Sequence, residues 1–167
     1  RQRRLGPGAA VRAGLLSAAE AGYAFAVVVD ADGQMDPGCI PALVAPLRAG
    51  VADLVRGSRL HPSSGGDAMP RLRLAAARAL RAPASWCAGQ PIEDPLSGFV
   101  ALRLSSFHGR LWSGFGYPMH LAAVVAAGGG RIVHSPVPAR YPKGGRSNHG
   151  LHRLPSVLAA FARAAQE

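Results

Sequence analysis

Short apolar runs rich in β-branched residues alternate with helical patterns in the first third of the chain, and this order limits the possible folds most. Residues 9–21 place apolar side chains at helical spacing, and residues 25–29 form an unbroken apolar run that contains three valines. Asp36 and Pro37 open a second helical pattern, and residues 52–56 form a second run. This alternation predicts a parallel α/β sheet, and the run at 25–29 predicts a strand buried on both faces.

The rest of the chain continues the alternation. After a loop, the pattern predicts a helix from Pro70 to near Pro83, strands at 99–104 and 131–137, and helices at 119–127 and 154–165. Prolines at the end of the run 131–137 place that strand at a sheet edge. We find no internal repeat and no domain boundary. Residues 1–167 are therefore expected to form one α/β domain with three layers, a mostly parallel Rossmann-like sheet between helices on both faces.

Composition limits the choice of partners. The 167 residues carry a formal charge of +10, from 19 Lys+Arg against 9 Asp+Glu, and 49% of them are hydrophobic. Such a basic chain can bind nucleic acid, anionic lipid head groups or phosphorylated small molecules. A GC-rich coding sequence is an equally good explanation, because all basic residues except Lys143 are arginine. Aromatic residues make up only 6% and no nucleic-acid motif occurs, so nucleic acid is not an expected partner.

Two carboxylates one residue apart follow the predicted strand at 25–29. Ligands of open α/β sheets bind at the carboxyl ends of strands, and residues i and i+2 of an extended segment point the same way. Asp30 and Asp32 can therefore converge on one Mg²⁺ or Mn²⁺ ion, and Gln34 offers a third oxygen. The alternative is an ordinary capped loop, in which aspartate and glycine are common.

Residues 28–37, with the sequence VVDADGQMDP, closely resemble the DxD segment of family 2 glycosyltransferases with the GT-A fold. The branch with the greatest similarity is that of dolichyl-phosphate mannose synthase and related polyprenyl-phosphate glycosyltransferases. Five further matches follow the family's order and together span nearly the whole chain: Gly6-x-Gly8-x-Ala10, Gly57-Ser58-Arg59, Asp94-Pro95-Leu96-Ser97-Gly98-Phe99, Val137-Pro138-x-Arg140-Tyr141 and Gly145-Arg146-Ser147. Each match alone is weak, whereas the ordered set is specific.

The resemblance implies transfer of a sugar from a nucleotide-diphosphate sugar, with inversion at the anomeric carbon. In this interpretation Asp30, Asp32 and Gln34 hold Mg²⁺ or Mn²⁺ on the donor diphosphate, and Asp32 counts among the catalytic residues. The cation would stabilise the charge that develops on the leaving group. Arg59 would bind the donor diphosphate or an acceptor phosphate, the alternative being a solvated arginine at a strand end.

The resemblance also implies where the acceptor binds. Glu93 and Asp94 stand where the family places acidic residues beside the acceptor. One of them would be the general base for a hydroxyl acceptor, and a structural role is equally open. A lipid phosphate is already anionic and needs no base, and Ser97 would hydrogen-bond to it. Four more residues would bind acceptor phosphate or else lie on a solvated surface: Arg71, Arg140, Arg146 and Ser147.

Three functions follow from these observations. The leading one is glycosylation of a polyprenyl phosphate by a cytoplasmic enzyme at the periphery of the membrane. The second is transfer to a sugar or polysaccharide hydroxyl, and the third is a basic binding module without catalysis. The helix at 154–165 packs on the sheet in our preferred interpretation, the alternative being contact with an anionic bilayer. In the family a βαβ unit precedes the first matched segment, so we expect the chain to be an N-terminally truncated catalytic domain.

Overall fold

The computed structural model describes residues 5–65, 69–141 and 154–166. In chain order its elements are α1 (Pro7–Glu20), β1 (Phe25–Val28), η1 (Pro37–Cys39), α2 (Ile40–Arg48), β2 (Leu54–Ser58), α3 (Arg71–Ala79), α4 (Arg81–Ala88), β3 (Val100–Arg103), η2 (Leu104–Ser106), α5 (Tyr117–Ala127), β4 (Ile132–Pro136) and α6 (Leu154–Ala164). Helices and strands therefore follow one another in nearly the predicted order.

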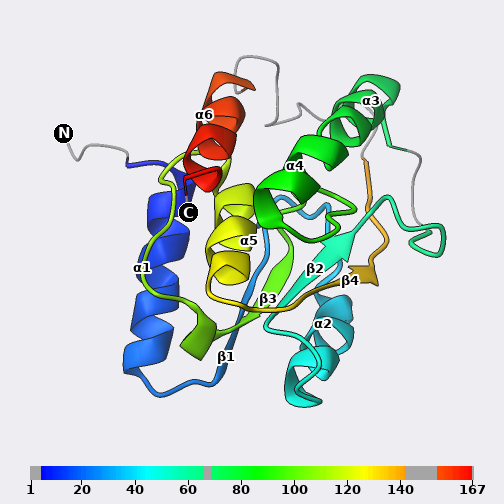
Figure 1. Ribbon diagram of the computed structural model, residues 1–167. Coiled ribbons are helices and arrows are strands. Elements are labelled where there is room, and N and C mark those ends of the chain that lie inside the picture. Colours follow the sequence, from blue (N-terminus) through cyan, green and yellow to red (C-terminus); the bar gives the residue numbers. More distant parts are fainter. Residues whose placement is uncertain (1–4, 66–68, 142–153, 167) are drawn as a thin grey trace.

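The strands form one mixed sheet in the order β1-β3-β2-β4 (Figure 1). β3 is antiparallel to both of its neighbours, with Phe25 opposite Arg103 and Leu54 opposite Leu102. β2 and β4 pair in parallel, with Leu54 opposite Ile132. Strands β1, β2 and β4 therefore run in one direction, and their carboxyl ends lie at the same edge of the sheet.

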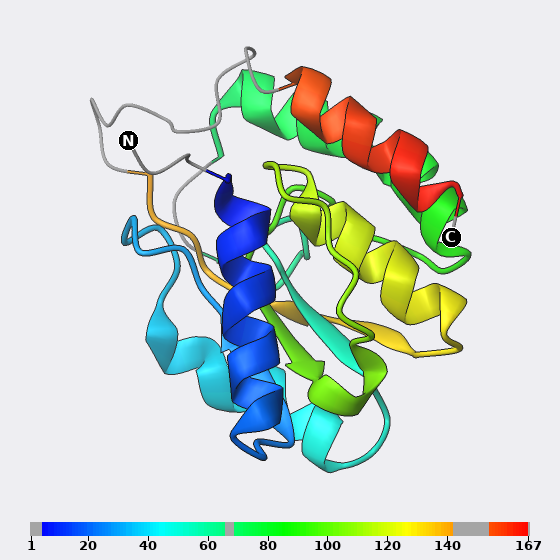
Figure 2. The ribbon, with the colours of Figure 1, turned by 90° about the vertical axis from the view of Figure 1, so that its left-hand side faces the viewer.

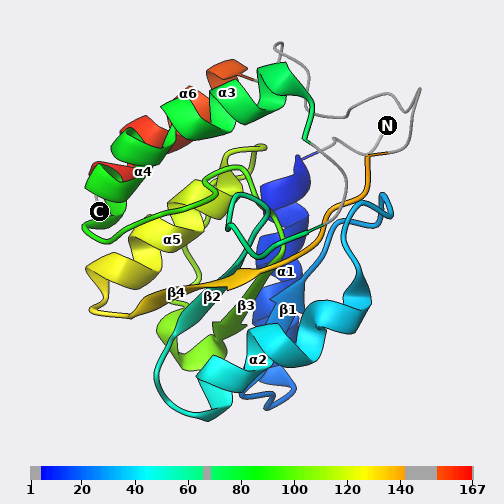
Figure 3. The same cartoon turned by 90° about the vertical axis from the view of Figure 1, so that its right-hand side faces the viewer.

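Helices cover both faces of this sheet, as Figures 1 and 3 show. On one face α5 and α1 pack against the strands, and α4 and α6 pack on α5 (Figures 2 and 3). The helix α2 covers the other face. Successive residues of β3 serve the two cores, because Leu102 packs with α5 and Ala101 packs with α2. The predicted three-layer α/β architecture is confirmed. The sheet is mixed rather than mostly parallel as expected, because β3 enters between β1 and β2 and is antiparallel to both.

Two expectations about single elements were wrong. The strand β1 is half-buried rather than buried on both faces, because it lies at one edge of the described sheet. The single helix expected from Pro70 to near Pro83 is two helices, α3 and α4, which meet at Leu80. Pro83 lies in the first turn of α4, where a missing backbone N–H costs no helical hydrogen bond.

Other local predictions are confirmed. Asp36 caps the turn before α2, since its carboxylate accepts a hydrogen bond of 2.8 Å from the backbone N–H of Gly38. The strand β4 lies at the second sheet edge, as its prolines predict. Ala160 and Phe161 of α6 are buried, and the helix packs on α5 and α4. It therefore packs on its own domain, as expected, but on the helical layer rather than on the sheet. None of the described helices combines the length and the apolar character that a membrane span requires.

Candidate active site

Asp30 and Asp32 follow β1 at the edge of the sheet where the parallel strands end. Asp32 folds its segment into a tight turn, because its Oδ1 accepts a hydrogen bond of 3.0 Å from the backbone N–H of Gln34. The pKa of Asp30 is raised by burial of its carboxyl group and by the nearby negative charge of Asp32. The positive charge of Arg59 opposes this rise. Two repelling carboxylates at the mouth of a cavity are an arrangement that a divalent cation stabilises.

A glycine and a tyrosine lie beside the Asp30 carboxylate. A Cβ on Gly98 would lie 3.0 Å from both Asp30 Oδ2 and the hydroxyl oxygen of Tyr117. Burial, together with the charge of Asp30, raises the pKa of the Tyr117 phenol, which therefore stays a neutral hydroxyl. Sequence analysis missed Tyr117, because no motif marks a tyrosine at the first position of a helix.

A cavity of about 490 Å³ lies in front of the two carboxylates. Its walls come from the start of α1, the segment 30–32, the loop before β3, the first turn of α5 and one residue of α6. The lining residues are Pro7, Asp30, Ala31, Asp32, Pro95, Leu96, Gly98, Phe115, Gly116, Tyr117, Pro118, Met119 and Val157. Within the part of the chain that the structure describes, Asp30 and Asp32 are the only carboxylates in this lining.

The Gly6-x-Gly8 motif shapes the wall of this cavity. A Cβ on Gly6 or Gly8 would collide with the backbone carbonyls of Ser113 and Trp112. The Gly8 N–H instead donates a hydrogen bond of 2.8 Å to the Ser113 carbonyl. The two glycines thus let α1 approach the segment that leads into α5, which brings Pro7 into the cavity wall.

Arg59 and Asp94 form a closed ion pair beside this site. The guanidinium donates from Nε to Asp94 Oδ2 at 2.7 Å and from Nη2 to Oδ1 at 2.9 Å. The backbone N–H of Arg59 also donates to Oδ2, at 3.1 Å. The Arg59 side chain is 6% exposed and that of Asp94 is fully buried. Burial alone would raise the pKa of Asp94, but the hydrogen bonds and charge of Arg59 outweigh it and lower that pKa.

This ion pair changes the roles expected for both residues. A carboxylate with two charge-assisted hydrogen bonds and a lowered pKa is a poor general base, because protonation would break the pair. The sequence analysis assigned Arg59 to phosphate binding. In the structure, two of its three guanidinium nitrogens donate to Asp94 instead. In this structure both side chains join the loop before β3 to the end of β2.

Arg56 is a functional residue that sequence analysis missed. It is fully buried, and its guanidinium donates to the carbonyl oxygens of Pro118 at 2.7 Å, Asp94 at 3.0 Å, Ser97 at 3.2 Å and Pro95 at 3.3 Å. Burial lowers its pKa to about 10, so it remains charged at neutral pH. Arg56 thus fixes both the loop 94–98 and the start of α5. An arginine inside the apolar strand β2 was the available signal.

Glu93 and Ser97 are not among the described residues that line the cavity. The backbone N–H of Glu93 donates to His134 Nε2 at 3.2 Å, and burial lowers the pKa of His134 to about 4, so this histidine is neutral. Glu93 Oε2 and Ser97 Oγ are buried and have no hydrogen-bond partner among the described residues. Either oxygen could bind a ligand that reached it.

The remaining predicted site residues are spread over several segments. Gln34 Oε1 accepts a hydrogen bond of 3.2 Å from Arg73, so in this structure its amide does not join the two aspartates as a free ligand. Arg71 and Arg140 are exposed. The backbone N–H of Arg140 donates to the Gln34 carbonyl at 2.9 Å, which brings its segment beside the DxD turn. Arg146 and Ser147 lie outside the described residues.

The residues at the cavity fit a divalent cation that is shared with a substrate. The described residues contain no cluster of three or more His, Cys, Asp or Glu side chains that could hold a metal ion by themselves. Mg²⁺ and Mn²⁺ are often held by one or two carboxylates together with substrate phosphates. Asp30 and Asp32 provide two carboxylates, and the absence of a Cβ at Gly98 leaves the space in which the Asp30 carboxylate lies.

Comparison with known sequences gives a family and close relatives. The family model described as glycosyl transferase family 2 matches residues 1–108. Two uncharacterized glycosyltransferases of Mycobacterium tuberculosis, Rv0539 and MT0564, and one of Mycobacterium bovis, Mb0553, are each 36% identical to the chain over 161 residues. The match covers 93% of this chain and 69% of each relative.

Comparison with solved structures gives the same architecture. Glucosyl-3-phosphoglycerate synthase from M. tuberculosis in complex with UDP has a TM-score of 0.62 at 21% identity, as has its complex with Mn²⁺, UDP-glucose and phosphoglyceric acid. Both matches cover 96% of this chain and 55% of the solved one. A further mycobacterial protein has a TM-score of 0.66 at 22% identity. The chain thus spans about half the length of these structures, and the likeness supports the fold.

Proposed function

Because the chain belongs to glycosyl transferase family 2, we propose that it transfers a sugar from a nucleotide-diphosphate sugar, with Asp30 and Asp32 holding the divalent cation. The observation that carries this proposal is that both carboxylates line one cavity at the carboxyl edge of the parallel strands. The cation, Mg²⁺ or Mn²⁺, would neutralise the charge that the diphosphate gains as the glycosidic bond breaks. The fold neighbour that contains Mn²⁺ and UDP-glucose supports this donor class.

Protein residues would orient the donor. The Asp30 carboxylate lies in the space over Gly98 and beside the Tyr117 hydroxyl, so these two residues limit the positions that it can take. Arg56 fixes the loop that carries Gly98 and the helix that carries Tyr117. Pre-formed positions of this kind reduce the cost of ordering the site when the donor binds.

The preferred acceptor is a polyprenyl phosphate. Its phosphate oxygen is anionic and can attack the anomeric carbon without a general base, with inversion of configuration. An acceptor that needs no base suits this cavity, because its described carboxylates, Asp30 and Asp32, are both assigned to the cation. The neighbouring Asp94 is paired with Arg59. Phosphate ligands in this proposal are Arg71 and Arg140, which are exposed, and Arg146, Ser147 and Ser97. A lipid acceptor would place the chain at a membrane surface.

A phosphorylated hydroxyl compound is the second candidate acceptor. The observation that favours it is the phosphoglyceric acid bound by the fold neighbour. A hydroxyl nucleophile needs a base, and Glu93 is the candidate, because its Oε2 is buried and lacks a hydrogen-bond partner among the described residues. Family membership argues against the basic module without catalysis.

A transfer assay tests the proposal and separates the two acceptors. The chain is incubated with Mn²⁺, a panel of radiolabelled nucleotide-diphosphate sugars, and either a polyprenyl phosphate or 3-phosphoglycerate. We expect a labelled lipid product that disappears with EDTA and with Asp30→Asn, and that persists with Asp36→Asn, a matched loss of charge outside the cavity. Product with 3-phosphoglycerate alone would contradict the lipid acceptor. Equal product from the wild type and Asp30→Asn would contradict the proposed function.

A further inference from the structure

The cavity of Asp30 and Asp32 has few polar side chains in its wall. Among the described residues that line it, only these two aspartates and Tyr117 have polar side chains. An ionised carboxylate accepts hydrogen bonds and donates none, so the phenol of Tyr117 is the only side-chain hydrogen-bond donor in that lining. A nucleotide diphosphate is an anion and is stabilised by donors. The described lining therefore offers it one donor side chain.

The hydroxyl oxygen of Tyr117 lies at the cavity, beside the Asp30 carboxylate. A Cβ on Gly98 would lie 3.0 Å from this oxygen and 3.0 Å from Asp30 Oδ2. Gly98, Asp30 and Tyr117 all line the cavity, so the two oxygens border the same small space in its wall. A ligand that binds to Asp30 through a shared cation therefore comes close to the phenol.

Packing limits the positions of the Tyr117 ring. The residue is 5% exposed and begins α5, in which residues 117–125 are all buried. A Cβ on Gly8 would lie 2.8 Å from the Cβ of Tyr117, so the bare backbone of α1 packs against the base of this side chain. Arg56 donates to the carbonyl oxygen of the next residue, Pro118, at 2.7 Å. A group that the fold already orders loses little conformational entropy when a ligand binds.

The Tyr117 hydroxyl has no hydrogen-bond partner among the described residues. Buried tyrosines usually have one, because taking a hydroxyl out of water without a partner costs free energy. A phenylalanine would fill the same space without that cost. Burial and the charge of Asp30 raise the pKa of the phenol, which keeps its proton and stays a donor. A ligand oxygen in the cavity would supply the missing acceptor.

We propose that the Tyr117 hydroxyl donates a hydrogen bond to a diphosphate oxygen of the donor substrate. This inference rests on the proposed function and adds a catalytic residue to it, because Tyr117 would touch the leaving group. As the glycosidic bond breaks, its electron pair goes to the diphosphate, and the acceptor oxygen forms the new bond to the anomeric carbon. The hydrogen bond strengthens as this charge develops. The diphosphate leaves as a stable anion, so the phenol keeps its proton throughout.

Tyr117→Phe tests the proposal, because it removes only the hydroxyl oxygen. Calorimetry measures the binding of inorganic pyrophosphate and of UDP in the presence of Mn²⁺. We expect both affinities to fall about tenfold, as expected when one hydrogen bond to a charged group is lost. The affinity for Mn²⁺ alone and the urea midpoint should stay at their wild-type values. In the transfer assay, kcat should fall about hundredfold.

Tyr23→Phe is the matched control. Tyr23 is 68% exposed and does not line the cavity, so its variant should bind pyrophosphate and UDP as the wild type does. A tenfold loss in Tyr117→Phe without a loss in this control would support the proposed contact.

The same measurements separate failure of this contact from failure of the proposed function. If Tyr117→Phe binds pyrophosphate and UDP with wild-type affinity, the hydroxyl does not contact the diphosphate, and the proposed function is unaffected. A weaker affinity for Mn²⁺ alone would show that the hydroxyl orders Asp30 instead, and a lower urea midpoint would show that it stabilises the fold. If the wild type binds neither pyrophosphate nor UDP with Mn²⁺, the proposed function and this contact are both contradicted.

Discussion

The ends of strands β1 and β2 carry charged side chains in opposite environments. After β1, Asp30 and Asp32 face a cavity, and burial and mutual repulsion raise the pKa of Asp30. After β2, Arg59 is closed on Asp94, whose pKa is lowered by the pairing although burial opposes it. One strand end therefore holds two carboxylates that the protein compensates only in part, through Arg59, whereas the other holds an ion pair.

This contrast separates ligand binding from support. Carboxylates that are only partly compensated can be stabilised by an external cation, so the β1 end is the part that a ligand completes. Compensated charges have no such need, and the β2 end instead fixes the loop that carries Gly98. Arg56 extends the support, since it joins this loop to α5 through backbone carbonyls. Changes at the β2 end should reduce stability, and changes at the β1 end should reduce ligand binding.

The largest expected effect on stability is that of Asp94→Asn. The substitution leaves the buried Arg59 without its counter-charge, which should lower the free energy of unfolding by about 3–5 kcal/mol. Asp36→Asn is the matched control and should change it by less than about 0.5 kcal/mol, because asparagine also caps the turn before α2. Urea denaturation followed by circular dichroism measures both values. Equal stability of the two variants would show that the ion pair is not the support described here.

Arg56→Lys should have the next largest effect. Lysine keeps the positive charge but loses the planar fork, so some of the four carbonyl acceptors would remain buried without a donor. We expect a loss of about 1–3 kcal/mol in the free energy of unfolding, measured in the same denaturation experiment. Arg48→Lys, an exposed arginine at the end of α2, is the control. A loss as small as that of the control would mean that a point charge alone holds the loop.

Gly98→Ala tests the connection between the two strand ends. The added methyl group would lie 3.0 Å from Asp30 Oδ2 and from the Tyr117 hydroxyl, so the Asp30 carboxylate must move. We expect weaker Mn²⁺ binding together with a stability loss of about 1 kcal/mol. The control is Gly14→Ala, in the open middle of α1, which should stabilise the helix by about 0.5–1 kcal/mol. Unchanged Mn²⁺ affinity in Gly98→Ala would separate Asp30 from the proposed ion site.

The pH dependence of stability should have opposite signs at the two carboxylates, and this is the smallest effect. The lowered pKa of Asp94 gives stability that is present above pH 3.8, the unfolded value, and is lost as the pH falls through the folded value. The raised pKa of Asp30 acts the other way, so its contribution to stability improves as the pH falls toward 3.8. Denaturation between pH 3 and 7 compares the wild type with Asp30→Asn and Asp94→Asn. Slopes of the same sign would contradict the comparison.

The two strand ends also differed in how well the sequence predicted them. Asp30 and Asp32 are one residue apart in one short segment, so the sequence alone indicated that they lie near each other. A turn at Asp32, rather than the expected extended alternation, brings both to one cavity. The partner of Arg59 is 35 residues away, and the pairing depends on how the loop before β3 folds back onto β2. Tyr117 and Arg56 were missed for the same reason, because only the packing of α5 against the sheet brings them to the site.

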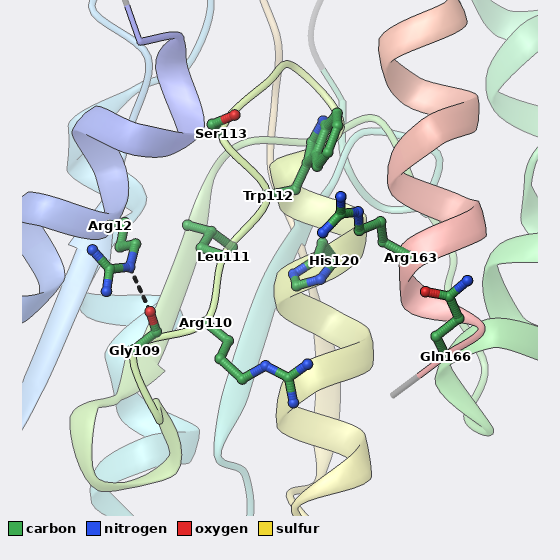
Figure 4. A pocket seen from close by; sticks show the side chains of 9 residues that line it. All are labelled: Arg12, Gly109, Arg110, Leu111, Trp112, Ser113, His120, Arg163 and Gln166. Carbon is green, nitrogen blue, oxygen red and sulfur yellow. Dashed lines mark hydrogen bonds between the residues drawn. The ribbon is translucent and has the colours of Figure 1, made fainter.

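The same reasoning applies to the fold. Helices, strands and the three layers follow from local periodicity, which the sequence contains directly. The half-buried state of β1 does not, because it depends on which strand lies beside β1 in the sheet, and β3 occupies only one of its edges in the described residues. The cavity lined by Arg12, Arg110 and Arg163 (Figure 4) was equally beyond sequence analysis, since these residues come from three separate segments.

Titration of Mn²⁺ into the chain with a nucleotide-diphosphate sugar, followed by the electron paramagnetic resonance signal of free Mn²⁺, tests the central claim most directly. The account predicts one bound Mn²⁺ in the wild type and in Asp94→Asn at a temperature where that variant is folded. It predicts loss of this binding in Asp30→Asn and in Asp32→Asn, with their unfolding transitions preserved. Wild-type Mn²⁺ affinity in both of these variants would contradict the assignment of the two carboxylates.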